Sequence, residues 1–209
     1  DRLDSLFIGV EEGSYIEPVE NPFRYRIVVK GSSVTHGLAA SRPGMSYAAR
    51  FGRNNGLYCF NLGFSGNALL DMEIAHLMAS VEDPGLFVLD YAPNAYADMI
   101  DANGEAFFRV IRDAHPDVPV IFIEDVIFPH TLFDNAILKE VTDKNLAQRR
   151  LYERLKKAGE KNIYYISAEG MIGDDGEATV DSIHFTDLGA MRYVDHVLPV
   201  IKKALRRNR

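Results

Sequence analysis

Short apolar runs alternate with segments of helical spacing along this chain. Runs of about four to eight apolar residues between turn residues are typical of buried strands, and five are predicted, at Arg26–Lys30, Leu57–Asn61, Leu86–Asp90, Val118–Glu124 and Ile163–Ile166. The segments between them repeat apolar residues at helical spacing and predict helices within Tyr47–Gly52, Leu70–Val81, Phe107–Ala114 and Ile137–Leu155. A last helix is predicted from Thr186 or Asp187 through Leu205, with Pro199 expected to kink it.

This alternation predicts a three-layer α/β/α fold, because each parallel crossover needs a connecting helix. We expect a five-stranded, mainly parallel sheet of flavodoxin-like order within a single domain over residues 25–209. Residues 1–24 are expected to be a linker or the remnant of an upstream β domain. An edge strand at Ser5–Val10 that wraps on the main domain is the alternative.

Composition narrows the classes of partner. Lys and Arg total 23 against 30 Asp and Glu, so the net charge of −7 argues against a nucleic-acid partner. No run approaches the roughly 20 apolar residues that cross a bilayer, so no membrane partner is expected. The chain begins at Asp1 rather than Met, so removal of an export signal, with a periplasmic or extracellular location, is one expectation. Cys59 stands alone in an apolar setting and is expected to be a buried strand thiol.

Four loops carry candidate chemistry, since ligands of open parallel sheets bind beyond the carboxyl ends of the strands. The Gly-Ser-Ser turn after the first strand offers Ser33 as a nucleophile. The glycine-rich loop after the second offers the Gly66 backbone N–H, and the third strand is followed by Asn94, whose amide is a second donor for an oxyanion. Before the last helix, Asp181 precedes His184 by three residues, so the carboxylate can orient the imidazole as a general base.

Each of these signals alone is more often structural than catalytic. Gly-Ser-Ser and Asn are common turn formers, and Asp-x-x-His is a common helix entry. Metal and cofactor chemistry are not expected. The other histidines show no His-x-x-x-His or clustered carboxylate spacing, and no Gly-Lys-Ser/Thr follows Gly31–Gly37. His36, three residues after Ser33, is a further candidate for shaping the site.

Together the motifs resemble those of the SGNH, or GDSL-type, hydrolases from Arg26 to about Leu205. The resemblance implies that Ser33 is the nucleophile, that Asp181 and His184 complete a triad, and that the oxyanion hole is formed by Ser33, Gly66 and Asn94. The stretch Gly31–Gly44, with the segment Ser41–Met45, especially resembles a bacterial branch in which a small β domain precedes the hydrolase. Two positions depart from the family pattern: Ser32 replaces Asp, and Pro93 and Ala95 flank Asn94 in place of Gly and Asp.

The resemblance implies an esterase that removes small acyl groups, acetyl among them, from a small-molecule or carbohydrate ester through an acyl-enzyme. A lipase or thioesterase of the same family is an alternative. A ligand-binding module on a decayed hydrolase scaffold is a second, from a different class of function, although decay is expected to remove Ser33, Asp181 or His184 first.

Overall fold

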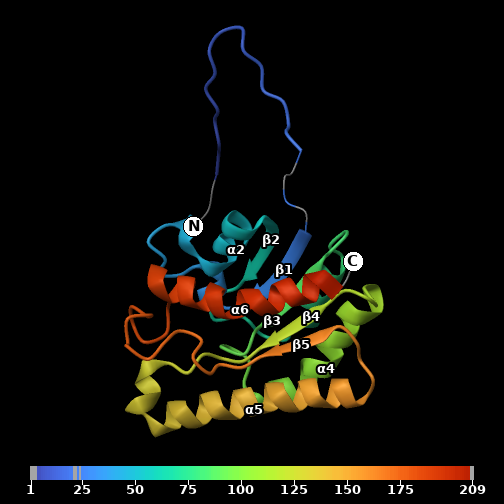
Figure 1. Ribbon diagram of the computed structural model, residues 1–209, viewed down its shortest axis with the longest axis vertical. Helices are drawn as coiled ribbons and strands as arrows, with labels where there is room; N and C mark the ends of the chain where they lie inside the picture. Colours follow the sequence, from blue (N-terminus) through green and yellow to red (C-terminus); the bar gives the residue numbers. More distant parts are fainter. Residues whose placement is uncertain (1–3, 21–22, 24, 208–209) are drawn as a thin grey trace.

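The computed structural model describes residues 4–20, 23 and 25–207. Five parallel strands form one sheet in the order β2-β1-β3-β4-β5, which confirms the predicted flavodoxin-like topology (Figure 1). The strands are β1 Tyr25–Gly31, β2 Leu57–Gly63, β3 Leu86–Asp90, β4 Val120–Ile123 and β5 Ile163–Ile166. The helices are α1 Ser33–His36, α2 Tyr47–Asn55, α3 Met72–Ala79, α4 Ala97–Ala114, α5 Asn135–Lys157 and α6 Asp187–Arg207, with 3₁₀ turns η1 Pro43–Met45 and η2 Pro129–Leu132.

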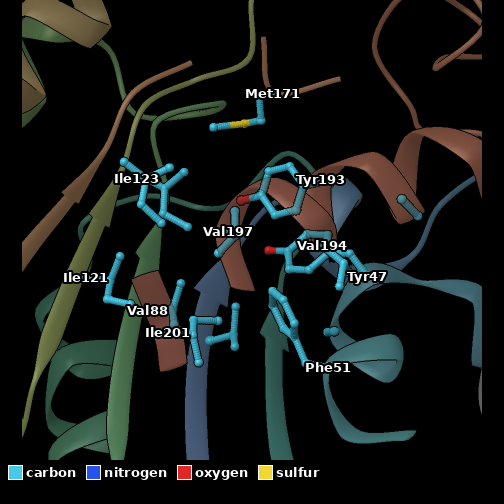
Figure 2. Close-up of a cluster of buried hydrophobic side chains, with 14 of the residues drawn as sticks. Tyr47, Phe51, Val88, Ile121, Ile123, Met171, Tyr193, Val194, Val197 and Ile201 are labelled. Atoms are coloured by element: carbon cyan, nitrogen blue, oxygen red, sulfur yellow. The ribbon is translucent and has the colours of Figure 1, made fainter. Parts of the chain in front are cut away.

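Helices cover both faces of the sheet, as the three-layer prediction requires. Successive residues of β1 face opposite cores, with Ile27 and Val29 in one and Val28 in the other. The first core lies under α2 and α6, where Tyr47, Phe51, Tyr193 and Val197 pack against Val88 and Ile121 (Figure 2). The second lies under α3, α4 and α5. Because both faces of the central strands are buried, these strands read as continuous apolar runs.

The direction in which successive strands are added to the sheet reverses at β1 and β3: β2 lies on one side of β1, and β3, β4 and β5 follow on the other. Strands β1 and β3 pair in parallel, with Gly31 of β1 opposite Asp90 of β3. The loop after β1 leads toward α2 and β2, whereas the loop after β3 leads toward α4 and β4. The loops diverge at the carboxyl edge, and such a switch point leaves a crevice for a ligand.

Some elements differ from the sequence-based predictions. The helix predicted at Phe107–Ala114 begins ten residues earlier, at Ala97. The prediction missed this first part because its only large apolar side chains are Met99 and Ile100, and only Ile100 and Gly104 are buried. The strand expected at Ser5–Val10 is wrong. Residues 4–20 form no helix or strand, and they extend away from the α/β body as an exposed excursion without a partner strand (Figure 1).

The structure also places Pro199 and Cys59, two single residues for which the sequence analysis states an expectation. Helix α6 continues through Pro199 to Arg207. Cys59 lies on β2 as predicted but is only half-buried, packed against the first core. The boundary between a linker over residues 1–24 and a domain over residues 25–209 remains a prediction.

Candidate active site

The nucleophile candidate lies at the start of a single helical turn that follows β1 directly. Ser32 is the N-cap of α1, and its hydroxyl accepts a hydrogen bond from the Val34 N–H at 3.3 Å, a role that Asp fills equally well. Ser33 is the first residue of α1 and is 7% exposed. The turn is tight enough that a Cβ on Gly31 would overlap the Thr35 side chain. This geometry brings the Ser33 hydroxyl to the carboxyl edge of the sheet.

Ser33, His184 and Asp181 form a continuous hydrogen-bonded chain. Ser33 Oγ lies 2.9 Å from His184 Nε2, and His184 Nδ1 lies 2.6 Å from Asp181 Oδ2. A carboxylate only accepts, so His184 carries its proton on Nδ1 and presents Nε2 as an acceptor to the serine hydroxyl. Asp181 and His184 lie 148 and 151 positions after Ser33 in the sequence. The three residues are nevertheless arranged as a Ser-His-Asp triad.

The loop Asp181–His184 holds its carboxylate with backbone groups. Asp181 Oδ1 accepts from the backbone N–H groups of His184 at 2.7 Å and of Ile183 at 3.0 Å, and Ser182 adopts a left-handed φ of 70°. Partial burial raises the pKa of Asp181, but the hydrogen bonds from the ring and backbone of His184 and from Ile183 outweigh it and lower the pKa to about 2. The carboxyl is therefore ionised at neutral pH, although the side chain is half-exposed.

Three hydrogen-bond donors converge on the same cavity as Ser33. They are the backbone N–H groups of Ser33 and Gly66 and the side-chain amide of Asn94, and none of them donates to another described residue. Asn94 Oδ1 accepts from the Ala68 N–H at 3.1 Å, which leaves Nδ2 as the free end of the amide. Gly66 has a φ of +68°, a conformation that glycine adopts without strain. These donors can receive an oxyanion in place of water.

Two buried lysines hold the loops that carry these donors. Lys30 Nζ donates to the Asn67 carbonyl at 3.1 Å and lies 4.6 Å from the centre of the Phe64 ring. Burial lowers the pKa of Lys30 to about 8, against the raising effect of Asp71. Lys144 on α5 donates to the Pro93 carbonyl at 3.1 Å and pairs with Glu140 at 2.8 Å. Lys30 thus holds the loop of Gly66, and Lys144 holds the loop of Asn94, in each case at the neighbouring residue.

The buried carboxyl group of Asp90 fixes the α1 turn through hydrogen bonds. Asp90, at the end of β3, accepts from the Tyr47 hydroxyl at 2.5 Å and from Thr35 Oγ1 at 3.4 Å. Burial raises the pKa of Asp90 to about 6, against the lowering effect of its hydrogen bonds, of which the Tyr47 bond is the largest. Because Thr35 belongs to α1, this network ties the turn that carries Ser33 to the sheet.

The candidate site opens into a cavity of about 380 Å³. Ser33, Gly66, Asn94 and His184 line it together with apolar and charged side chains from the loop after β4 and from α5, namely Asp125, Phe128, His130, Ile137, Glu140, Val141 and Lys144. Within the described ranges, no three His, Cys, Asp or Glu side chains are grouped so that they could hold a metal ion. No helix among the same residues has the length and apolar character to cross a membrane.

The structure brings together all five residues that the sequence analysis selected. His36 does not join them, since its ring is exposed and its Nδ1 lies 3.3 Å from the Gly63 carbonyl, outside the cavity. The sequence analysis missed Lys30, Lys144, Asp90 and His130. A buried lysine inside an apolar strand run was a readable signal for Lys30. No pattern in the chain indicated that Lys144 or His130 faces the site.

The model of the GDSL-like lipase/acylhydrolase family matches residues 24–202. The comparison with curated proteins gives no significant match.

Several solved structures share the fold. A protein described as a GDSL-like lipase from Bacteroides ovatus is 38% identical, with a TM-score of 0.88 over 94% of this chain and 58% of that one. A salicylyl-acyltransferase from a tetracycline biosynthetic pathway is 21% identical, with a TM-score of 0.72 over 90% of this chain and 56% of that one. A family two carbohydrate esterase from Clostridium thermocellum, in complex with cellohexaose, is 16% identical, with a TM-score of 0.66 over 90% of this chain and 67% of that one. The chain thus spans less than two thirds of the first two of these proteins.

Proposed function

Because the chain belongs to the GDSL-like lipase/acylhydrolase family, we propose that it is a serine esterase that cleaves small acyl esters through an acyl-enzyme. The observation that carries this proposal is the hydrogen-bonded chain from Ser33 Oγ through both nitrogens of His184 to the Asp181 carboxylate. A serine hydroxyl is a weak nucleophile near neutral pH and needs such a base within hydrogen-bond reach.

In the first half of the reaction, Ser33 Oγ attacks the acyl carbon while His184 Nε2 takes the hydroxyl proton. The resulting imidazolium is stabilised by the ionised Asp181, which does not take the proton itself. The C–O bond to the alcohol then breaks, and His184 gives its proton to the leaving oxygen. The products of this half are a free alcohol and an ester between the acyl group and Ser33.

In the second half, water replaces the alcohol. His184 removes a proton from the water as its oxygen attacks the acyl carbon, and it returns that proton to Ser33 Oγ as the acid leaves. In both halves negative charge develops on the carbonyl oxygen, where the N–H groups of Ser33 and Gly66 and the amide of Asn94 stabilise it.

The volume and the lining of the cavity favour a small and polar substrate. The cavity has a volume of about 380 Å³, and its wall includes the charged side chains of Glu140 and Lys144 and the buried carboxyl group of Asp125. A long alkyl chain would have to lie against these charges, which disfavours a lipase among the alternatives. Two proteins of the same fold support a sugar as the alcohol part and acetyl as the acyl group: the family two carbohydrate esterase in complex with cellohexaose, and a two-domain esterase active on acetylated mannans.

The proposal is tested by the Ser33→Ala variant with p-nitrophenyl acetate as substrate. We expect a loss of at least about 1,000-fold in kcat, because the nucleophile is removed. A fluorophosphonate should label the wild type at Ser33, as mapped by peptide mass spectrometry. Ser5→Ala, at an exposed position of the N-terminal excursion, is the matched control and should retain full activity. Equal turnover by wild type and Ser33→Ala would leave the binding-module alternative standing.

The finer resemblance, to a branch with a small β domain before the hydrolase, belongs to the same proposal. The larger size of the Bacteroides ovatus protein supports it, since this chain covers 58% of that one. The exposed excursion of residues 4–20 would then be the linker. The reading frame of the natural gene tests this directly, because a β-rich segment encoded ahead of Asp1 is expected.

A further inference from the structure

His130 lies in the wall of the cavity and is not part of the triad. It belongs to η2, in the loop after β4, and its ring stacks on Phe128 with ring centres 5.9 Å apart and planes 15° apart. His130 Nδ1 lies 3.0 Å from the carbonyl oxygen of Ser182, the residue between Asp181 and Ile183 in the triad loop. The ring is therefore fixed on one side by stacking and at one nitrogen by a hydrogen bond.

The hydrogen bond to Ser182 determines what the other nitrogen can do. A carbonyl oxygen only accepts, so Nδ1 of His130 must carry a proton. In the neutral imidazole, Nε2 is then an acceptor. Within the described part of the chain, Nε2 of His130 has no hydrogen-bond partner, and the residue lines the cavity beside Ile183 and His184. The lining of the cavity thus includes a fixed ring whose Nε2 is used by no group in the described part of the chain.

The proposed chemistry determines which part of the ester lies near this acceptor. His184 must give its proton to the leaving oxygen, so the alcohol part lies on the side of Ser33 that faces His184. His130 is bonded to the loop that carries His184, and it lies on that same side. Ile183, exposed at the cavity wall, supplies apolar surface there. A hydroxyl on the alcohol part would meet Nε2 of His130.

Resting on the proposed function, we infer that His130 is a specificity-determining residue that accepts a hydrogen bond from a free hydroxyl group on the alcohol part of the ester. The substrate class is then a partly acylated polyol or sugar in which a free hydroxyl neighbours the acylated oxygen. Fully acylated or simple alkyl esters lack this donor and gain nothing from His130.

Two variants of His130 separate binding of the substrate from support of the triad loop. In His130→Asn, the side-chain amide nitrogen can take the place of Nδ1 and donate to the Ser182 carbonyl, but no atom replaces Nε2. In His130→Phe, the ring still stacks on Phe128, but both nitrogens are lost. His130→Asn is therefore the test of the acceptor, and His130→Phe reports what the bond to Ser182 contributes.

Three substrates are compared. The first is a methyl glycoside with a single acetyl group and free neighbouring hydroxyls, the second is the same compound with those hydroxyls O-methylated, and the third is p-nitrophenyl acetate. We expect the wild type to prefer the first over the second by about tenfold in kcat/KM, the worth of one hydrogen bond. His130→Asn should abolish this preference, mainly through KM, and should lower turnover of p-nitrophenyl acetate by much less than it lowers turnover of the first glycoside.

Two results would overturn the inference. One is a wild type that hydrolyses the free and the O-methylated glycoside equally well. The other is a parallel loss on all three substrates in His130→Asn, which would show a structural role alone. Ser33→Ala is measured alongside, because its loss of turnover tests the esterase mechanism whatever the outcome for His130. Failure of the inference and failure of the proposed function are therefore distinguishable.

Discussion

The side chain of Asn94 is oriented by a backbone group from a different loop. The Ala68 N–H donates to its Oδ1, so the amide nitrogen is left for the cavity. Ala68 follows the Gly66 turn after β2, whereas Asn94 follows β3, and the bond therefore links the two loops that carry oxyanion donors. A donor held in advance costs no reorganisation when charge develops on the substrate.

Asn94→Ala is expected to lower kcat for p-nitrophenyl acetate by about 100- to 1,000-fold with little change in KM, because a donor to the developing oxyanion is lost. Asn103→Ala, on the exposed surface of α4, is the matched control and should behave as wild type. A rise in KM with unchanged kcat would show instead that Asn94 acts in substrate binding.

At the scale of elements, the position of the nucleophile depends on how closely α1 follows β1. Thr35 packs over Gly31, and its hydroxyl contacts both Tyr47 and Asp90. The short helix is thus fixed to α2 and to the end of β3 by side chains that touch no substrate. A shift of this turn would separate Ser33 from His184, which is anchored independently ahead of α6.

Gly31→Ala tests this arrangement, because its new Cβ would overlap the Thr35 side chain. We expect the free energy of unfolding to fall by about 1–3 kcal/mol, as for other overpacked sites. We also expect kcat to fall by about tenfold or more, as the turn of Ser33 is displaced. Urea unfolding and p-nitrophenyl acetate kinetics measure the two effects. Gly9→Ala, which meets no atom within 4 Å, should change neither.

At the scale of the whole molecule, the carboxyl edge of the sheet carries buried acidic groups beneath the cavity. Burial raises the pKa of Asp125 to about 7, against the lowering effect of Lys144, and the charge of Asp90 contributes to the rise. Asp90 itself has a pKa of about 6. Between pH 4 and pH 7 the folded protein therefore binds more protons at these two groups than the unfolded chain does. They make the free energy of unfolding fall as the pH rises through this window.

Asp181 makes the free energy of unfolding change with pH in the opposite direction, because its pKa is lowered to about 2. Its contribution to stability is present above about pH 4 and is lost as the pH falls toward 2. Asp90 and Asp125 thus stabilise the fold most at low pH, whereas Asp181 stabilises it above about pH 4.

The Asp90→Asn variant is expected to lose less stability than the wild type when the pH is raised from 4 to 7.5. A change from the ordinary value of 3.8 to about 6 corresponds to a difference on the order of 3 kcal/mol. Urea unfolding at several pH values measures it, with the exposed Asp113→Asn as control. An identical pH dependence in wild type and Asp90→Asn would contradict the assignment of this effect to Asp90.

The sequence alone was enough to predict the five strands, the three layers and the strand order. Buried parallel strands must be apolar on both faces, and each crossover needs a helix, so the strands and the layers can be predicted from local patterns. It also placed Gly66, Asn94, Asp181 and His184 in loops, as the structure has them, and Ser33 in the turn after the first strand, where the structure has the start of α1. The start of α4 was missed because its first ten residues contain only two large apolar side chains, Met99 and Ile100, and so carry little periodic signal.

The contacts around the site were decided only by the tertiary structure. Lys30 with Asn67, Lys144 with Pro93 and His130 with Ser182 are pairs separated by 37, 51 and 52 positions. No local pattern specifies such pairs, because each depends on where two loops arrive after the sheet has closed against its helices. Local sequence sets which groups reach the carboxyl edge, whereas packing of the whole chain sets their distances and orientations there.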